Sequence, residues 1–476
     1  MTRSLPFRPR IFRDPIHGDI GYARGPFQRL VEEVIDTEMF QRLRGIRQTS
    51  EMNMVFHGAE HSRFSHSMGA AYLAGQMFDA AARNSDAQVT AEERADTVLA
   101  SLLHDVGHGP FSHSLEEIIG GGFRHERMTV RLLEEPTSEL HQVLAASDPA
   151  RPARLRAYLD HGRGQGRWYH AIVSSQLDAD RLDYLARDAH MAGIHTHQVD
   201  SARLVQSLGV MDEYLVIDRR AHDIIETFLL ALDQMYEMAY YHKTVRAAAL
   251  QLQAIIQRAV DLAHQEPTRW RPRLFPERAG EPDPFWTLLE RGDRVPLSVY
   301  ASLQEAHVFA LLASWRTAGD PLLADLLTAW RSRRLPKALR VEVPDTPAAL
   351  ARWQELIELG RRTWMQLHPD RPAEAARYFV FFDEPRRLSY KRYAIGQDGS
   401  QTSFAFASPG GEPPAHLPND RAESIKITTH AGGWQAIEDD PRSIANNLSQ
   451  KRYFPRLFVP AEVRAALEPQ LGVAVA

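Results

Sequence analysis

The sequence predicts a mainly α-helical protein that carries a small C-terminal lobe of mixed α and β structure. Apolar residues recur at steps of three and four along residues 27–48, and residues 221–263 combine dense apolar spacing with no glycine or proline. Both patterns are typical of helices that bury one face. From residue 378 onward, short runs rich in aromatic and β-branched residues alternate with turn formers, which favours strands. The main part of the chain is therefore expected to be a helical bundle.

The N-terminal half alternates between predicted loops and helices. Thr90 and Glu93 have the spacing of a capping box, so a helix is expected to begin there and to end at His104 and Asp105. The preceding segments are expected to be an irregular stretch with a turn at 14–18, two short helices, a loop rich in His and Ser, and a helix: residues 1–26, 27–48, 57–67 and 68–82.

The second half is expected to contain more helices and then the small lobe. Residues 221–263 fit one long helix or two abutting ones, and residues 266–296, rich in Pro, Arg and Gly, are expected to form an exposed connection. Further helices are expected at 172–188, 298–333 and 347–365, and strands at 378–382, 390–395, 402–407 and 425–429. The expected division is a main helical domain, a linker with a helical extension, and the lobe: 1–265, 266–370 and 371–476.

Composition excludes several classes of protein. Of 476 residues, 44% are hydrophobic, enough for a sizeable core, and the formal charge of 56 minus 61, or −5, gives no global signal for nucleic acid. The chain has no cysteine, so any metal must be held by histidine and carboxylate. We find neither a signal peptide nor a run of 18 apolar residues, so a cytoplasmic protein without a membrane partner is expected.

The stretch of residues 102–116 concentrates the chemistry. An apolar helix is expected to deliver His104 and Asp105 together at its end, which suits a divalent metal. Glycines and a proline then break the helix, and His113 and Glu116 follow three residues apart, close enough to share one helix face for proton transfer. The alternative is chance, because a chain with 21 histidines places some of them near acids.

Several separated blocks resemble the HD-domain phosphohydrolases, and most closely their deoxynucleoside triphosphate triphosphohydrolase branch. The blocks read Asp-Pro-Ile-His-Gly, Phe-Gln-Arg-Leu-Arg, Arg-Phe-Ser-His-Ser-Met-Gly, the histidine-rich motif, and Asp-Ala-Asp-Arg-Leu-Asp-Tyr-Leu-Ala-Arg-Asp, at 14–18, 40–44, 63–69, 104–113 and 178–188. The resemblance implies an HD-domain helical bundle with residues 1–265 as its catalytic core. It continues more thinly through Tyr240 to Lys243.

The resemblance also implies the roles of individual residues. The metal ligands would be His66, His104, Asp105 and Asp180. His113 would be the catalytic histidine and Glu116 its carboxylate partner, which fixes the imidazole tautomer and raises its basicity. His61, five residues before His66, is assigned a loop or phosphate-proximal position instead.

The implied substrate contacts divide into phosphate and sugar positions. The phosphate group comprises Arg63, His108, His125, Arg181, Tyr184 and Lys243; the sugar group comprises Gln48, Thr49, Asp188 and Tyr240. Two positions depart in type from the animal enzyme: Arg181 stands in place of a lysine, and Thr49 in place of a leucine under the sugar. A hydroxyl at Thr49 puts strict selection of deoxyribose in question, and Tyr240 has core packing as its alternative role.

The implied activity is metal-dependent hydrolysis of a deoxynucleoside triphosphate (dNTP) to deoxynucleoside and triphosphate. It would use one divalent transition metal (Fe, Mn, Zn, Ni or Co), with additional Mg on the substrate phosphates left open. Implied partners are a dNTP or NTP allosteric effector and further copies of the chain, as a homo-oligomer (dimer, tetramer or hexamer). The basic stretch 3–13 keeps single-stranded DNA open as a partner. The alternatives are an HD-type phosphodiesterase or DNA exonuclease, and a non-catalytic dNTP sensor.

Overall fold

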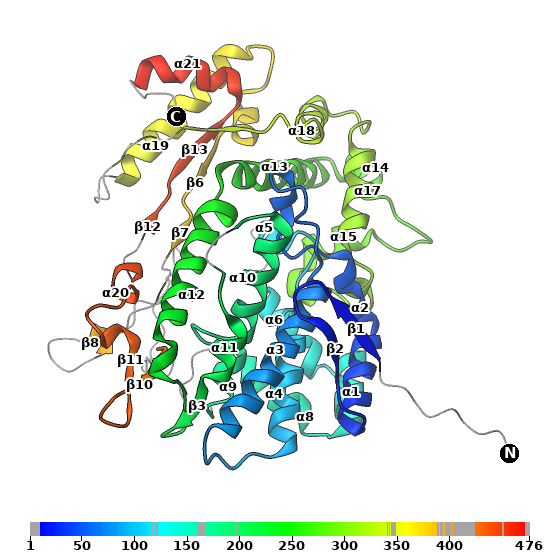
Figure 1. Cartoon of the computed structure of the whole chain (residues 1–476). Helices are drawn as coiled ribbons and strands as arrows, with labels where there is room; N and C mark the ends of the chain where they lie inside the picture. Colours follow the sequence, from blue (N-terminus) through cyan, green and yellow to red (C-terminus); the bar gives the residue numbers. More distant parts are fainter. Residues whose placement is uncertain are drawn as a thin grey trace.

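The computed structural model confirms the mainly α-helical prediction. It describes residues 10–116, 118–119, 122–159, 167–195, 198–339, 341, 343, 349–387, 390, 394–395, 401–402, 424–449 and 452–471. Over these residues, helices form a large body with a smaller α+β lobe above one end (Figure 1). No helix within the described ranges is long and apolar enough to cross a membrane.

Three helices form the centre of the main body: α3 (Arg63–Arg83) packs against α4 (Ala91–Leu103) and α10 (Ala179–Ala192). Most of α3 is buried on all sides, because glycines and alanines let its neighbours approach closely. Around this centre lie α1 (Pro26–Asp36), α2 (Glu38–Gln41), η1 (Arg42–Gly45), η2 (Ser50–Met54), α5 (His113–Glu116), α6 (His125–Glu134), α7 (Glu139–Ser147), α8 (Arg151–Leu159), α9 (His170–Val173) and α11 (Ser201–Gln206).

The predicted capping box is present, since the Thr90 hydroxyl accepts from the Glu93 amide and the Glu93 carboxylate accepts from the Thr90 amide. The loop predicted at 57–67 is shorter than expected. Ser62 caps α3, so the helix already begins at Arg63 and places His66 in its first turn.

Residues 11–21 form a β-hairpin where irregular structure was expected. Strands β1 (Ile11–Asp14) and β2 (Gly18–Gly21) are antiparallel, with the fully buried Ile20 opposite Phe12. Gly18 has a φ of 73°, a value that suits glycine, at the end of the predicted turn.

The predicted spine at 221–263 is two abutting helices, the second of the two forms expected. Helix α12 (His222–Met235) runs into one π-helical turn, η4 (Tyr236–Tyr240), and α13 (Lys243–Gln265) follows. Strands β3 (Leu208–Met211) and β4 (Tyr214–Ile217) and turn η3 (Arg219–Ala221) precede them.

The prediction that residues 266–296 form an exposed connection is wrong. Two helices lie in this stretch, α14 (Pro267–Leu274) and α15 (Pro284–Arg291). Both begin with proline, which is compatible with the first turn of a helix. They bury Trp270, Phe285 and Trp286, while their arginines face outward. The helices that follow are η5 (Gly292–Arg294), α16 (Leu297–Ala301), α17 (Glu305–Trp315) and α18 (Pro321–Arg331).

The C-terminal lobe is built on a three-stranded antiparallel sheet with the order β5 (Lys337–Leu339), β13 (Arg456–Val459), β6 (Phe381–Asp383). Helices α19 (Ala349–Leu367) and α21 (Ala461–Leu471) pack with it around a second apolar cluster that includes Trp353, Trp364 and Leu457. The smaller elements of the C-terminal part are η6 (Ala373–Tyr378), β7 (Arg386–Arg387), β8 (Ala394–Ile395), β9 (Gln401–Thr402), η8 (Ile437–Asp439), α20 (Ala445–Leu448) and β12 (Arg452–Tyr453). Of these, α20 packs against α12 of the main body.

One strand of the C-terminal part joins the main body. Strand β10 (Lys426–Thr428), near the strand predicted at 425–429, pairs in parallel with β4 and antiparallel with β11 (Trp434–Ala436). The sheet order is β11-β10-β4-β3. Most of the strand predicted at 402–407 lies outside the described residues, and the division at residue 371 stays a prediction.

Candidate functional site

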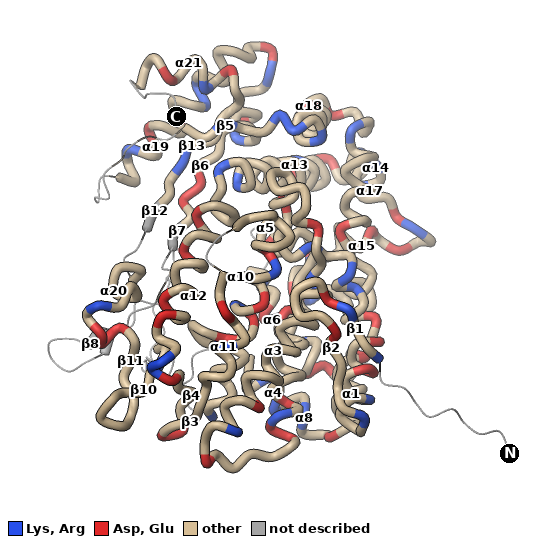
Figure 2. The backbone as a smooth tube through the Cα atoms, in the orientation of Figure 1, with Lys and Arg blue, Asp and Glu red and all other residues tan. Residues whose placement is uncertain are grey.

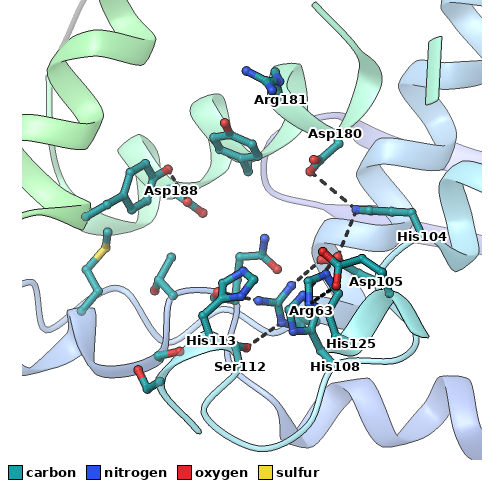
Figure 3. Close-up of a pocket in the computed structure, with 18 of the residues that line it drawn as sticks. Arg63, His104, Asp105, His108, Ser112, His113, His125, Asp180, Arg181 and Asp188 are labelled. Carbon is teal, nitrogen blue, oxygen red and sulfur yellow. Dashed lines mark hydrogen bonds and ion pairs between the residues drawn. The ribbon is translucent and has the colours of Figure 1, made fainter. Parts of the chain in front are cut away.

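A cavity of about 830 Å³ opens between α10, η4, α13, η2 and the segment around α5. Thirteen of the sixteen predicted site residues line it; His66, Glu116 and Lys243 are the exceptions. Figure 3 shows Asp180, His104 and Asp105 gathered on one side of this cavity and Asp188 on the other.

Four predicted ligands converge at one end of the cavity. His66 comes from the first turn of α3, His104 and Asp105 from the end of α4, and Asp180 from the first turn of α10. His66 Nε2 lies 3.3 Å from His104 Nε2, 3.0 Å from Asp180 Oδ1 and 3.7 Å from Asp105 Oδ2. His104 Nε2 lies 3.5 Å from an oxygen of each aspartate. The structure therefore brings together these donors from three helices.

The orientation of the two imidazoles suits a cation. The Nδ1–H of His66 donates to Asp183 at 2.8 Å and that of His104 donates to the Ser101 carbonyl at 2.7 Å. When each neutral ring has its proton on Nδ1, both Nε2 lone pairs face the same point. Two lone pairs 3.3 Å apart repel unless a proton or a metal ion lies between them. His66, His104 and Asp105 form a group that could hold a metal ion, with Asp180 beside it.

The electrostatic potential at this end of the cavity is negative. Burial alone would lower the pKa of His66, but the carboxylates of Asp180 and Asp183 outweigh it and raise the pKa to about 10. The pKa of His104 is also raised, because Asp105 and Asp180 outweigh burial. The cluster therefore attracts positive charge, which a divalent ion can supply in place of protons.

A buried network behind His66 was missed by the sequence reasoning. Asp183 is fully buried and accepts hydrogen bonds from His66 and from Arg187 Nε and Nη2, the latter two at 2.8 and 2.9 Å. Its Oδ1 also lies 2.6 Å from His17 Nε2. Arg187 also donates to Asp14 at 2.8 Å. Asp183 and Arg187 lie three and seven residues after Asp180, on one helix face, and that spacing is the signal that could have identified them.

The absence of a side chain at Gly69 leaves room for this network. A Cβ atom on Gly69 would lie 1.9 Å from Asp183 Oδ1 and 2.4 Å from an Arg187 nitrogen. The glycine in the Arg-Phe-Ser-His-Ser-Met-Gly block is thus required by the ion pair that packs against α3.

His113 and Glu116 form a pair, but Glu116 is shared with His125. His113 Nδ1 lies 3.5 Å from Glu116 Oε2, while His125 Nδ1 lies 2.7 Å from Glu116 Oε1. Burial raises the pKa of Glu116, but hydrogen bonds from His113 and His125 outweigh it, so the pKa is well below its usual value. Glu116 is therefore ionised beside both rings, and the His113 side chain, 69% exposed, borders the cavity.

The predicted phosphate residues fall into two groups. His108 stacks on His125 with ring centroids 3.6 Å apart, and nitrogens of His108, His113 and His125 lie within 4.8 Å of one another. Arg63 is buried, pairs with Asp105 and donates to Ser112 Oγ at 2.8 Å.

Arg181 and Tyr184 line the opposite wall, on α10. Lys243 is exposed at the start of α13 and does not line the cavity, so its phosphate role stays a prediction.

The predicted sugar residues meet at the other side. Asp188 Oδ2 accepts from the Tyr240 hydroxyl at 2.6 Å, and Asp188 Oδ1 lies 2.7 Å from His61 Nε2. His61, which the sequence places in a loop or near the phosphates, lies in a loop and is part of the Asp188 cluster. The side-chain oxygens of Gln48 and Thr49 are buried and have no hydrogen-bond partner within the described part of the chain.

The comparisons with known proteins agree with this geometry. A sequence model of the HD domain matches residues 63–188. An uncharacterised Bacillus subtilis protein, YwfO, is 31% identical over 403 residues, covering 85% of this chain and 86% of its own.

Human deoxynucleoside triphosphate triphosphohydrolase SAMHD1 is 30% identical over 273 residues, which is 49% of this chain and 42% of that protein. The chain thus spans under half the length of that relative. A crystal structure of a Bacteroides thetaiotaomicron phosphohydrolase has 26% identity and a TM-score of 0.73, covering 95% of this chain and all of that one.

Proposed function

Because the chain belongs to the HD-domain family of phosphohydrolases, we propose that it hydrolyses deoxynucleoside triphosphates to a deoxynucleoside and triphosphate. The observation that carries the proposal is the composition of one cavity. A histidine and aspartate cluster with the donor set of a divalent metal lies at one end, cationic and imidazole groups follow, and a Tyr240–Asp188 pair lies at the other. A triphosphate joined to a sugar has groups complementary to all three: anionic oxygens for the metal and the cationic groups, and hydroxyls for the Tyr240–Asp188 pair.

His66, His104, Asp105 and Asp180 would hold the metal. A bound divalent metal supplies Lewis-acid stabilisation of the charge that develops at the α-phosphate. The set of two imidazoles and two carboxylates fits Fe, Mn, Zn, Ni or Co. Arg63 and Arg181 bind phosphate oxygens from two sides, and this charge compensation is organised before the substrate arrives.

His113 moves the proton. With Glu116 accepting from Nδ1–H, the Nε2 atom of His113 is free to exchange a proton with the water or with the leaving 5′ oxygen. The exposed ring can reach a substrate in the cavity without displacing buried groups. Asp188 and Gln48 bind the 3′ hydroxyl, and Tyr240 crowds the 2′ carbon.

The deciding experiment incubates metal-loaded protein with each of the four dNTPs, the four rNTPs and single-stranded DNA, with and without a second dNTP as activator. Release of triphosphate and deoxynucleoside from dNTPs, with intact DNA, is the expected result. Loss of DNA without triphosphate release would identify a phosphodiesterase or exonuclease instead. Tight dNTP binding without turnover under all of these conditions would identify a sensor.

A further inference from the structure

The cavity wall contains a buried carboxylate that the proposed reaction does not use. Glu51 lies in η2, is 3% exposed and lines the cavity. Its Oε2 accepts from the Ser114 hydroxyl at 2.8 Å, whereas its Oε1 is buried without a hydrogen-bond partner among the described residues. A buried carboxylate oxygen without a donor is costly, so its retention in a cavity wall points to a donor on a ligand.

The position of Glu51 relative to the other groups indicates which part of a ligand it meets. It contacts α5 through Ser114, and its own turn, η2, packs on α13, whereas the metal cluster is built on α3, α4 and α10. In a nucleotide the sugar separates the base from the triphosphate. With the triphosphate at the metal cluster and the sugar at Asp188 and Tyr240, the base occupies the end lined by Glu51.

We propose that Glu51 recognises the base of the substrate and selects guanine. An ionised carboxylate only accepts hydrogen bonds and can accept two side by side. Among the four bases, guanine alone presents two adjacent N–H donors, N1–H and the 2-amino group, on one edge. Adenine and cytosine place an acceptor nitrogen beside their amino group, and thymine flanks its single N–H with two carbonyls. This inference rests on the proposed function, because it takes the ligand to be a nucleotide.

The surroundings of Glu51 make this recognition sensitive to pH. Burial raises the pKa of the Glu51 carboxyl to about 7, and Glu305 of α17 raises it further; the Ser114 hydroxyl, the backbone amide of Glu51 and Arg246 act against this. Arg246 forms a two-armed ion pair with Asp383 at 2.6 and 2.9 Å, so the arginine that acts on Glu51 is itself held by another carboxylate. Selection of guanine strengthens as Glu51 ionises.

The test measures kcat/KM for dGTP, dITP and dTTP with the metal-loaded wild type, Glu51→Gln, Glu51→Ala and the control Glu60→Gln. dITP keeps N1–H and lacks the 2-amino group. We expect the wild type to prefer dGTP to dITP by roughly 10-fold, the value of one good hydrogen bond to a base edge. The preference should fall below about 2-fold in both Glu51 variants and persist in Glu60→Gln, because Glu60 is exposed and does not line the cavity.

The ratio of kcat/KM between two substrates distinguishes a role of Glu51 in base recognition from a purely structural role. If Glu51 only supported Ser114 and the adjacent His113, its replacement would slow all three substrates equally and leave the ratios unchanged, which would overturn the inference. A wild type that treats dGTP and dITP alike would also overturn it. Between pH 6 and pH 8 the dGTP to dITP ratio should rise in the wild type and stay flat in Glu51→Gln, because effects on the chemical step cancel in the ratio.

Failure of the proposed function and failure of the Glu51 assignment give different results. If the wild type hydrolyses no dNTP, the proposed function is wrong, and dissociation constants for dGTP and dITP, measured by calorimetry on the same variants, test Glu51 alone. Equal affinities in the wild type would then refute the assignment. A dGTP preference that is lost in both Glu51 variants would support it.

Discussion

The two ends of the cavity differ in how fully the protein satisfies their polar groups. At the metal end, His66 and His104 each have their second nitrogen fixed by Asp183 or by a backbone carbonyl. At the sugar and base end, side-chain oxygens of Gln48, Thr49 and Glu51 are buried without partners in the described structure. The first end is organised by the protein itself, which suits a resident ion. The second leaves acceptor oxygens open to a ligand, which suits recognition.

Replacing Asp180 should have the largest effect, because it removes a ligand from the organised end. We expect Asp180→Ala to lose bound metal and turnover together. His113→Ala should keep the metal and lose roughly 10²- to 10⁴-fold in kcat, the usual size of a general acid–base contribution. Metal content by elemental analysis and kcat on the same preparations check both. A metal-free His113→Ala protein would contradict this division of roles.

Replacing Asp183 tests whether the metal end depends on its buried support. Asp183→Ala leaves Arg187 without its main partner and frees the His66 ring, so we expect a loss of roughly 3 to 5 kcal/mol in the free energy of unfolding. Metal affinity should fall by about 10- to 100-fold. The control is Asp36→Ala, whose exposed ion pair with Arg10 contributes about 1 kcal/mol or less. Denaturant unfolding and metal titration distinguish the two variants.

Substitutions at two glycines of α3 compare a site that packs against the Asp183–Arg187 pair with one that does not. Gly69→Ala pushes a methyl group into the Asp183–Arg187 pair and should destabilise the protein by about 1 to 3 kcal/mol. Gly75→Ala meets its nearest atoms at 3.4 Å, so its higher helix propensity should offset any strain and leave stability within about 1 kcal/mol. Equal melting temperatures for the two variants would show that the network tolerates displacement.

The raised pKa of Glu51 predicts a pH dependence of stability between about pH 4.5 and pH 7. The folded protein holds a proton on Glu51 up to about pH 7, whereas the unfolded chain releases it near pH 4.5. Stability from this group is therefore present below pH 4.5 and falls as the pH rises to about 7, by roughly 2 to 4 kcal/mol in all. The difference in unfolding free energy between the wild type and Glu51→Gln should show this fall. A pH-independent difference would contradict it.

The smallest effect is expected at Thr49. Its hydroxyl is buried and without a partner among the described residues, so it can bond a 2′ hydroxyl and weaken the exclusion of ribose. Thr49→Leu should raise the ratio of kcat/KM for dNTP over rNTP by roughly 10-fold, equivalent to about 1.4 kcal/mol. An unchanged ratio would place Thr49 away from the sugar.

The sequence was most informative where chemistry and local pattern coincide. The predicted convergence of His66, His104, Asp105 and Asp180 is found because helix ends and the resemblance both point to them, although their role as ligands stays a prediction. The importance of Asp183 was not predicted: its helical spacing from Asp180 can be read from the sequence, but its contacts with His17 and His66 are tertiary.

The same limit explains the errors in the fold. The Pro- and Arg-rich composition of residues 266–296 concealed helices whose tryptophans are buried against distant parts of the chain. The hairpin at 11–21 depends on a turn whose strands, at four residues each, are too short to leave an alternating pattern. In both cases tertiary packing outweighed local preference.

The pairing of β10 with β4 bears on the order in which the protein folds. Ile217 and Ile427 are partners although 427 − 217 = 210 residues separate them, and closing so long a loop costs about 5 kcal/mol of chain entropy. We therefore expect the pairing to form late, after the helical body. Until then one edge of β4 has unpaired backbone groups, open to pairing with another chain. In the folded chain β10 covers that edge of β4.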